Sequence, residues 1–95
     1  MKEQLKQIIE HYGVLKQLKY FQSEVFELNE AIIRAENKYE PIQDIDHIAE
    51  EIADCYVMLE QFKLYYNIEN MEIAKIMKNK INRTLERMES GYYEK

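Results

Sequence analysis

The sequence predicts an all-α fold, in which an antiparallel helical hairpin with accessory helices forms a four-helix bundle on dimerisation. Helix-forming residues dominate the composition, and only 2 glycines and 1 proline are available for the turns of a β-rich fold. Apolar residues recur at alternating spacings of three and four along most of the chain, as expected for one buried helix face. Because the chain has 95 residues, we expect a single domain over 1–95, with 91–95 as a frayed tail.

Two helices are predicted in the first part of the chain. The first runs from about Lys2 to Tyr12, and Gly13 forms the joint after it. The second runs from about Val14 to Asn37 and carries a long apolar stripe. This stripe consists of Leu18, Phe21, Val25, Leu28 and Ile32.

Two further helices follow the segment 38–43, which contains Pro41 and is predicted as a loop because proline disfavours helix at the residue before it. The third helix runs from about Ile45 to Tyr66, and Asn67 can end it in the left-handed conformation. The fourth starts near Glu69 or Asn70 and continues to about Ser90. Their apolar stripes are Ile48, Ile52, Cys55, Leu59, Phe62 and Tyr66 on the third, and Ile73, Ile76, Met77, Ile81, Leu85 and Met88 on the fourth.

Composition limits the possible functions. A helical domain of this size buries a small core alone, so we expect other subunits to cover part of its apolar surface. The net charge of −5 argues against binding to a nucleic-acid polymer, which needs a basic face. The single cysteine, the lack of an apolar run of about 20 residues and the polar N-terminus predict a soluble, cytoplasmic protein that does not bind membranes.

Two pairs of carboxylates stand three residues apart on the central helices, Glu24 with Glu27 and Glu51 with Asp54. Residues at this spacing share a helix face, so each pair can direct two carboxylates at one spot. On a helical wheel both pairs lie on the same side of their own apolar stripe, so antiparallel packing would bring the four carboxylates together at one edge of the interface. The spacing alone is weak, because it recurs at Glu27/Glu30, Glu69/Glu72 and Glu86/Glu89.

Four carboxylates held close together repel one another, and a hard divalent cation removes this repulsion. Mg²⁺ prefers oxygen ligands and shares its shell with water and phosphates. The absence of a histidine or thiolate partner in the pattern therefore favours Mg²⁺, or Mn²⁺, over zinc.

Four short motifs resemble the signature of MazG-type nucleoside triphosphate pyrophosphohydrolases, and the similarity extends from about Ile8 to Met88. The motifs are His11-Tyr12-Gly13, Gln17-Leu18, Ser23-Glu24-Val25-Phe26-Glu27-Leu28 and Glu50-Glu51-Ile52-Ala53-Asp54. Members of this family carry an E-x-x-E, a variable spacer and an E-x-x-D, all on helices. Ser23 departs from the family pattern, which usually has a glutamate at this place.

The resemblance implies a reaction and a set of roles. Glu24, Glu27, Glu51 and Asp54 would bind Mg²⁺, which holds the triphosphate and polarises the water that attacks the α-phosphorus. The substrate would be an NTP or dNTP, and the products a nucleoside monophosphate and pyrophosphate. Glu27 or Glu51 is expected to orient the water as a catalytic residue. The family also implies self-association into homodimers or tetramers.

A basic segment on the last helix of the family implies further contacts with substrate. At the matching positions Asn79, Lys80 and Arg83 are candidates for binding the outer phosphates, although Thr84 replaces the second arginine of the pattern. A solvated basic face near a helix C-terminus is an equally open interpretation.

The chain has no tryptophan, so base stacking would fall to Tyr12, Tyr20 or Tyr56, although aromatic residues at helical spacing are more often core. His11 and His47 are isolated and are expected to be exposed or to cap helices. Cys55 is expected to be a small buried hydrophobic residue.

Two other functions remain open from the sequence. A helical dimer needs no chemistry, so the chain could be a non-catalytic interaction module with an acidic rim. Phosphoribosyl-ATP pyrophosphohydrolase also pairs an E-x-x-E helix with an acidic helix, and it is the alternative within the same fold.

Overall fold

Four α-helices form the described part of the chain, and the all-α prediction is confirmed. The computed structural model describes residues 1–37 and 44–91, and no strand occurs within these two ranges. The helices are α1 (Lys2–Tyr12), α2 (Val14–Glu36), α3 (Asp44–Tyr65) and α4 (Asn70–Glu89). Each boundary lies within about one residue of its prediction, a difference no larger than the usual uncertainty of helix ends. The predicted loop with Pro41 and the tail from Tyr92 onward lie outside the described residues.

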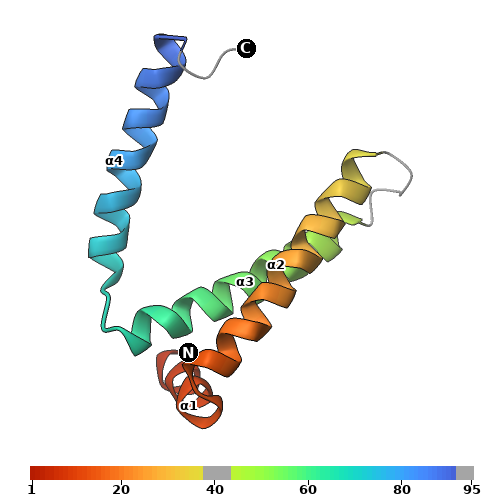
Figure 1. Cartoon of the computed structure of the whole chain (residues 1–95), viewed down its shortest axis with the longest axis vertical. Coiled ribbons are helices and arrows are strands. Elements are labelled where there is room, and N and C mark those ends of the chain that lie inside the picture. Colours follow the sequence, from red (N-terminus) through yellow and green to blue (C-terminus); the bar gives the residue numbers. More distant parts are fainter. Residues whose placement is uncertain (38–43, 92–95) are drawn as a thin grey trace.

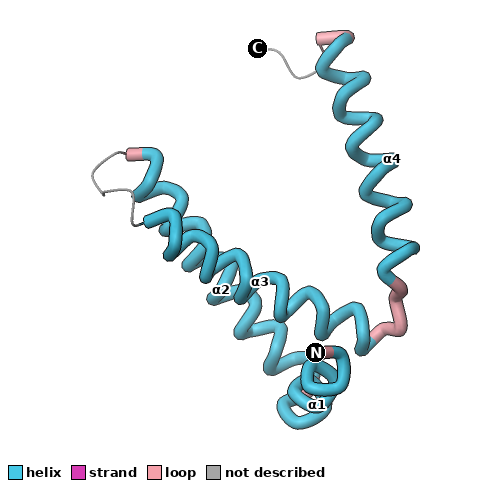
Figure 2. The backbone as a smooth tube through the Cα atoms, turned by 180° about the vertical axis from the view of Figure 1, so that it is seen from behind, coloured by secondary structure: helices cyan, strands magenta, loops and turns pink. Residues whose placement is uncertain are grey.

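α2 and α3 form an antiparallel pair, and α1 packs across the end of this pair where α2 begins and α3 ends (Figures 1 and 2). Phe21 on α2 meets Phe62 on α3 edge to face, with 5.7 Å between the ring centroids. The amide of Gln17 donates a hydrogen bond of 2.9 Å to Gln61 near the same end. Because Gln17 lies early on α2 and Gln61 lies late on α3, these contacts define the antiparallel register.

Gly13 joins α1 to α2 without any intervening loop. Its backbone has φ 88° and ψ 154°, a combination that is essentially restricted to glycine. Its amide donates a hydrogen bond of 2.8 Å to the carbonyl of Ile9, and its carbonyl accepts one of 3.1 Å from the amide of Gln17. Gly13 therefore ends α1 and begins α2, and the sharp turn brings α1 back against the hairpin.

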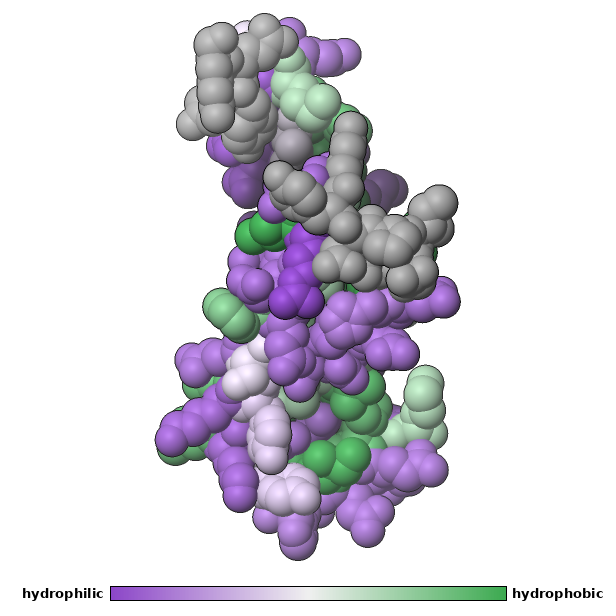
Figure 3. Space-filling model, turned by 90° about the vertical axis from the view of Figure 1, so that its right-hand side faces the viewer, coloured by the Kyte–Doolittle hydropathy of each residue, from purple (hydrophilic) through white to green (hydrophobic). Residues whose placement is uncertain are grey.

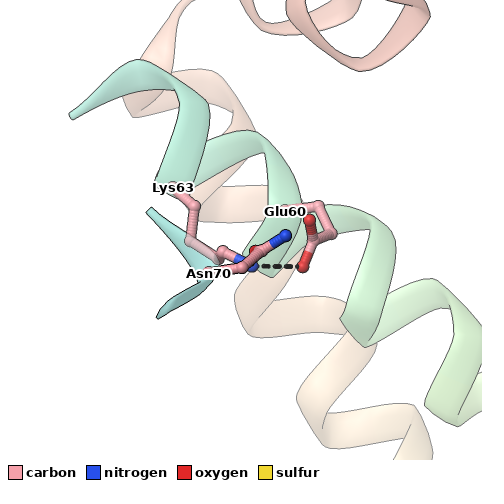
Figure 4. A network of polar contacts seen from close by, with 3 residues as sticks. All are labelled: Glu60, Lys63 and Asn70. Atoms are coloured by element: carbon pink, nitrogen blue, oxygen red, sulfur yellow. Dashed lines mark hydrogen bonds and ion pairs between the residues drawn. The ribbon is translucent and has the colours of Figure 1, made fainter. Parts of the chain in front are cut away.

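The joint between α3 and α4 is a helix-ending motif built around Asn67. Asn67 has φ 56°, and the left-handed conformation predicted for it is confirmed. The amide of Ile68 donates to the carbonyl of Lys63, and the amide of Asn67 donates to the carbonyl of Leu64, which is the Schellman pattern. Lys63 also contacts the side chain of Asn70 and forms an ion pair of 2.7 Å with Glu60, so one side chain spans the joint (Figure 4).

α4 extends away from the other three helices, and apart from the Lys63–Asn70 contact at the joint it does not pack against them (Figure 2). None of its residues is buried. The radius of gyration is 16.8 Å, whereas a compact domain of this length has about 12 Å. The predicted inner face of α4, with Ile76, Ile81 and Leu85, is therefore exposed in the single chain.

The core of the single chain is small. Its buried apolar residues are Ile9, Ala31, Cys55 and Met58, and the prediction that Cys55 is a buried hydrophobic residue is confirmed. Much of the predicted stripe on the hairpin is exposed, and Figure 3 shows apolar surface among the polar surface on one face. The exposed members of the stripe are Leu18, Val25, Ile32, Ile52, Leu59 and Tyr66. The hairpin thus buries only part of each stripe and leaves the rest outward.

Within residues 1–37 and 44–91, none of the helices has both the length and the apolar character needed for a bilayer crossing.

We predict that Gly13→Ala lowers the free energy of unfolding by about 1–3 kcal/mol, because alanine is strained in this backbone conformation. A Cβ at this position would meet no atom within 4 Å, so the loss would come from the backbone rather than from a clash. Urea unfolding followed by circular dichroism measures the change. Gly91→Ala is the matched control, since Gly91 also has a positive φ and open surroundings but lies beyond α4. An equal effect of both substitutions would contradict a special role for the α1–α2 joint.

Candidate metal centre

Three polar pairs face one another across the seam between α2 and α3. Gln17 lies opposite Gln61, Glu24 opposite Asp54, and Glu27 opposite Glu51. On α2 these residues are spaced by seven and three positions, and their partners on α3 have the same spacing in reverse. Since seven residues make about two helical turns, one face of each helix presents the whole series. The same antiparallel register therefore sets both the amide pair and the carboxylates.

Glu24, Glu51 and Asp54 form a compact cluster. Each offers a carboxylate oxygen, and these oxygens all lie within 4.8 Å of one another. Glu51 is 6% exposed, Glu24 is half-buried, and Asp54 is open to solvent. One oxygen of Glu24 (Oε2) and one of Glu51 (Oε2) are enclosed and have no hydrogen-bond partner within residues 1–37 and 44–91. Enclosed carboxylate oxygens without donors are costly, and a cation satisfies them directly.

The enclosure of these carboxylates also shifts the pKa values of Glu24 and Glu51. Burial raises the pKa of Glu24 to about 7, and the charges of Asp54 and Glu27 add to this effect. Burial also raises the pKa of Glu51, with further contributions from Glu27 and Asp54, while His47 acts in the opposite direction. Among the described residues, no lysine or arginine is a neighbour that shifts either pKa. Within the described ranges, the charges of Glu24 and Glu51 are therefore not balanced by a lysine or an arginine.

Glu27 is the fourth predicted ligand, and it lies beside the cluster rather than within the three-residue group. Its carboxyl interacts directly with that of Glu51 and helps to raise the pKa of Glu51. Glu27 is exposed, in contrast to Glu51. The four predicted residues are thus brought together, with Glu24, Glu51 and Asp54 closest to one another.

The position of the cluster differs from the expected one. Helical wheels predict the carboxylates at the edge of an apolar interface, but Glu51 is buried within the seam itself. The wheel assumed that each whole apolar stripe faces the other helix. In the structure part of each stripe turns outward, and the contact face rotates toward the carboxylates.

His47 is a neighbour that the sequence pattern did not identify. Its Nε2 atom lies 3.9 Å from Oε1 of Glu51, one helical turn away on α3. The i, i+4 spacing of His47 and Glu51 was the available signal. The His47 side chain is half exposed, whereas that of Glu51 is buried.

A cavity of about 260 Å³ adjoins the cluster on the side of α1. Glu24 and Asp54 form part of its wall, and Tyr12 and Tyr20 line it, as two of the predicted stacking residues would. Tyr56, the third, is 65% exposed and does not line this cavity. The sequence did not identify the other lining residues as site residues, although Gln17 belongs to the Gln17-Leu18 motif. These residues are Ile8, Gln17, Val57, Met58 and Gln61.

The predicted phosphate-binding residues Asn79, Lys80 and Arg83 are exposed on α4. Because α4 does not pack against the hairpin, the single chain does not bring them to the carboxylates. Their role stays a prediction.

Comparisons with protein-family models, curated proteins and solved structures find no match to this chain.

Without divalent cations, Glu24 should make the fold less stable as the pH rises from 5 to 8. The ordinary pKa of this carboxyl is 4.5, and in the folded chain it is about 7. The folded state therefore holds the proton more tightly, and the resulting stability is present below pH 4.5 and is lost as the pH rises through 7. Thermal unfolding in chelator should show that Glu24→Gln gains stability over the wild type between pH 5 and 8. A constant difference across this range would contradict the assignment.

At pH 8, Mg²⁺ should stabilise the wild type but not Glu24→Gln. A ligand at 100 times its dissociation constant stabilises a protein by about 2.7 kcal/mol, and a domain of this size gains roughly 4–8 °C per kcal/mol. Melting temperatures at fixed protein concentration, with and without Mg²⁺, measure the effect. Glu86→Gln on exposed α4 is the control and should retain the full shift. The same shift in all three proteins would mean that Mg²⁺ acts elsewhere.

Proposed function

We propose that this protein is a Mg²⁺-dependent nucleoside triphosphate pyrophosphohydrolase, which converts an NTP or dNTP to the monophosphate and pyrophosphate. The observation that supports it most is the meeting of Glu24, Glu51 and Asp54 within 4.8 Å, with two enclosed oxygens that have no donor in the part of the chain that the structure describes. Such a group destabilises a helix pair that serves only for packing. It is useful where cations and phosphates must be held.

The donor set fits Mg²⁺ or Mn²⁺. Every candidate ligand atom is a carboxylate oxygen, and Asp54 leaves one side of the cluster open to solvent for the remaining ligands. When bound, the ion would supply charge neutralisation for the triphosphate and polarise the attacking water. The rigid helices α2 and α3 keep the carboxylates in register, so little reorganisation is needed when substrate arrives.

The protein side chains then have separate roles. Glu24, Glu51 and Asp54 would hold the ion, and the Glu27–Glu51 pair lies where one carboxylate could orient the water and accept its proton. In the reaction, the water oxygen forms a bond to the α-phosphorus, and the bond from this phosphorus to the oxygen bridging to the β-phosphorus breaks. Pyrophosphate leaves with the bridging oxygen. These reaction steps are the ones that the resemblance to MazG-type enzymes implies.

We further propose that the protein works as a homo-oligomer. The exposed surface is 8279 Å², whereas a compact monomer of this mass exposes about 5,800 Å². The excess is comparable to the surface that an obligate interface covers. The apolar face of α4 and the outward part of the hairpin stripes are the natural contact surfaces. In an oligomer, Lys80 and Arg83 on α4 would bind the outer phosphates of a substrate held at the candidate metal centre of a neighbouring subunit.

Purified protein with Mg²⁺ should release pyrophosphate and a monophosphate from at least one nucleotide. The panel should contain the common NTPs and dNTPs together with phosphoribosyl-ATP, so that both pyrophosphohydrolase assignments are tested. Glu51→Gln should lower kcat by at least about 100-fold, the scale of a lost electrostatic or acid–base contribution. Chromatographic analysis of products, with separate assays of pyrophosphate and orthophosphate, measures the reaction.

Glu86→Gln is the matched control for this assay. Glu86 and Glu89 have the same E-x-x-E spacing, but they lie on exposed α4 and outside the candidate metal centre. This variant should keep the activity of the wild type. Wild-type turnover by Glu51→Gln would contradict the carboxylate assignment. If no nucleotide of the panel is hydrolysed, the result would instead favour a non-catalytic interaction module.

Leu85→Glu should weaken self-association by placing a charge on the apolar face of α4. Light scattering after size-exclusion chromatography should give at least twice the chain mass of 11.6 kDa for the wild type and a smaller value for the variant. Asn82→Glu adds the same charge on the polar side of the same helix and should leave the mass unchanged. A wild type that is monomeric at all concentrations would contradict the proposed assembly.

A further inference from the structure

The cavity beside the carboxylates has a wall formed by two buried amides. Gln17 on α2 is 4% exposed and Gln61 on α3 is 1% exposed, and both line the cavity. Glu24 and Asp54 line the same cavity, so a molecule bound there would extend directly to the candidate metal centre. The cavity therefore has one anionic end and one end that consists of neutral amides.

The hydrogen bonds of this pair fix which way each amide points. Gln61 Nε2 donates to the backbone carbonyl of Val57 at 3.3 Å, and this carbonyl can only accept. Gln61 therefore turns its Oε1 toward Gln17, and Gln17 must present its Nε2, which donates at 2.9 Å. The sulfur of Met58 lies near both amide nitrogens, at 4.0 Å from Gln17 and 3.7 Å from Gln61.

One acceptor is left over by this arrangement. Oε1 of Gln17 is enclosed and has no hydrogen-bond partner among the described residues. A flip of the amide would not help, because it would set two oxygens against each other across the Gln17–Gln61 contact. An unsatisfied buried acceptor destabilises a fold, so a packing role alone gives no reason to keep it.

We propose that Oε1 of Gln17 accepts a hydrogen bond from an amino group on the nucleobase of the substrate, which occupies this cavity. The inference rests on the proposed function, since the carboxylates would hold the triphosphate of the same molecule. Both sides of the Gln17 nitrogen are engaged, so Gln17 offers the cavity an acceptor and no donor. A base with an amino group, such as cytosine or adenine, suits this acceptor, whereas a carbonyl at the same place is repelled.

Tyr12 and Tyr20 provide the faces against which a base can stack. They line the cavity and are 47% and 51% exposed, so both rings present surface to a ligand there. Because Oε1 of Gln17 is enclosed in the free chain, the proposal requires the side chains around it to shift when the base enters. Aromatic stacking accepts any base, because every base has a π-face. Stacking therefore gives affinity, and Gln17 gives the preference between bases.

The test measures binding separately from turnover. Calorimetry in Mg²⁺ compares α,β-imido analogues of dCTP with dUTP, and of ATP with ITP. Within each pair the exocyclic amino group is replaced by a carbonyl, and the adjacent ring nitrogen gains a proton. For at least one pair, the amino analogue should bind about tenfold more tightly, the contribution of one hydrogen bond and one avoided repulsion. Equal affinities within both pairs, or no binding of any analogue, would overturn the inference.

The variant that tests the residue is the double substitution Gln17→Met with Gln61→Met. Replacing both partners by apolar groups of similar shape is close to neutral for stability, whereas a single substitution would leave the other amide unpaired. In the double variant, the affinities for the amino and carbonyl analogues should differ by no more than about twofold, while the Mg²⁺-dependent rise in melting temperature persists. Gln22→Met, the same change at an exposed position of α2, should keep the tenfold preference. Unchanged discrimination in the double variant would overturn the role of Gln17.

These measurements separate the two proposals. Pyrophosphate release with equal treatment of amino and carbonyl bases would leave the enzyme proposal standing and remove the inference about Gln17. Discrimination in binding that the double variant abolishes, without pyrophosphate from the hydrolysable nucleotides, would support the Gln17 site and remove the proposed reaction.

Discussion

The antiparallel seam between α2 and α3 is the constraint on which the rest of the structure depends. It is filled in large part by polar side chains, with the Gln17–Gln61 pair at one level and the carboxylates of Glu24, Glu51 and Asp54 at the next. An apolar seam would hold the two helices together more strongly, since buried charges without partners are destabilising. The fold therefore gives up packing energy along its central contact, which is consistent with the proposal that these polar groups hold a ligand.

This constraint also explains the open shape of the single chain. A hairpin that uses its contact face for carboxylates and amides has few apolar residues left to bury within one subunit. Among the residues that the structure describes, the buried apolar side chains are those of Ile9, Ala31, Cys55 and Met58. The remaining apolar surface lies on the outward part of the stripes and on α4, which makes no packing contact with the other helices. Association between subunits would supply the core that one chain lacks, and it would also lock the site residues onto rigid elements.

Much of the fold could be predicted from the sequence because local signals agree with one another. Gly13 and Asn67 mark the joints, and the apolar spacing between them gives helix boundaries close to those of the structure. The grouping of the four carboxylates could be predicted because residues with the same spacing on two antiparallel helices lie opposite one another. The depth of Glu51 could not be predicted, since a wheel does not tell a stripe that faces another helix from one that faces another subunit. The Gln17 oxygen was also missed, because its isolation depends on the orientation of three groups from two helices.

The most direct test of the central claim, that the carboxylates in the seam hold a divalent cation, is anomalous X-ray diffraction from crystals grown with Mn²⁺. We expect a peak at the manganese absorption edge at a coordination distance of roughly 2.1 Å from oxygens of Glu24, Glu51 and Asp54. The peak should disappear in crystals of Glu51→Gln. Saturating Mn²⁺ that leaves this cluster without a peak, while the carboxylates keep the positions described for them, would contradict a metal centre between α2 and α3.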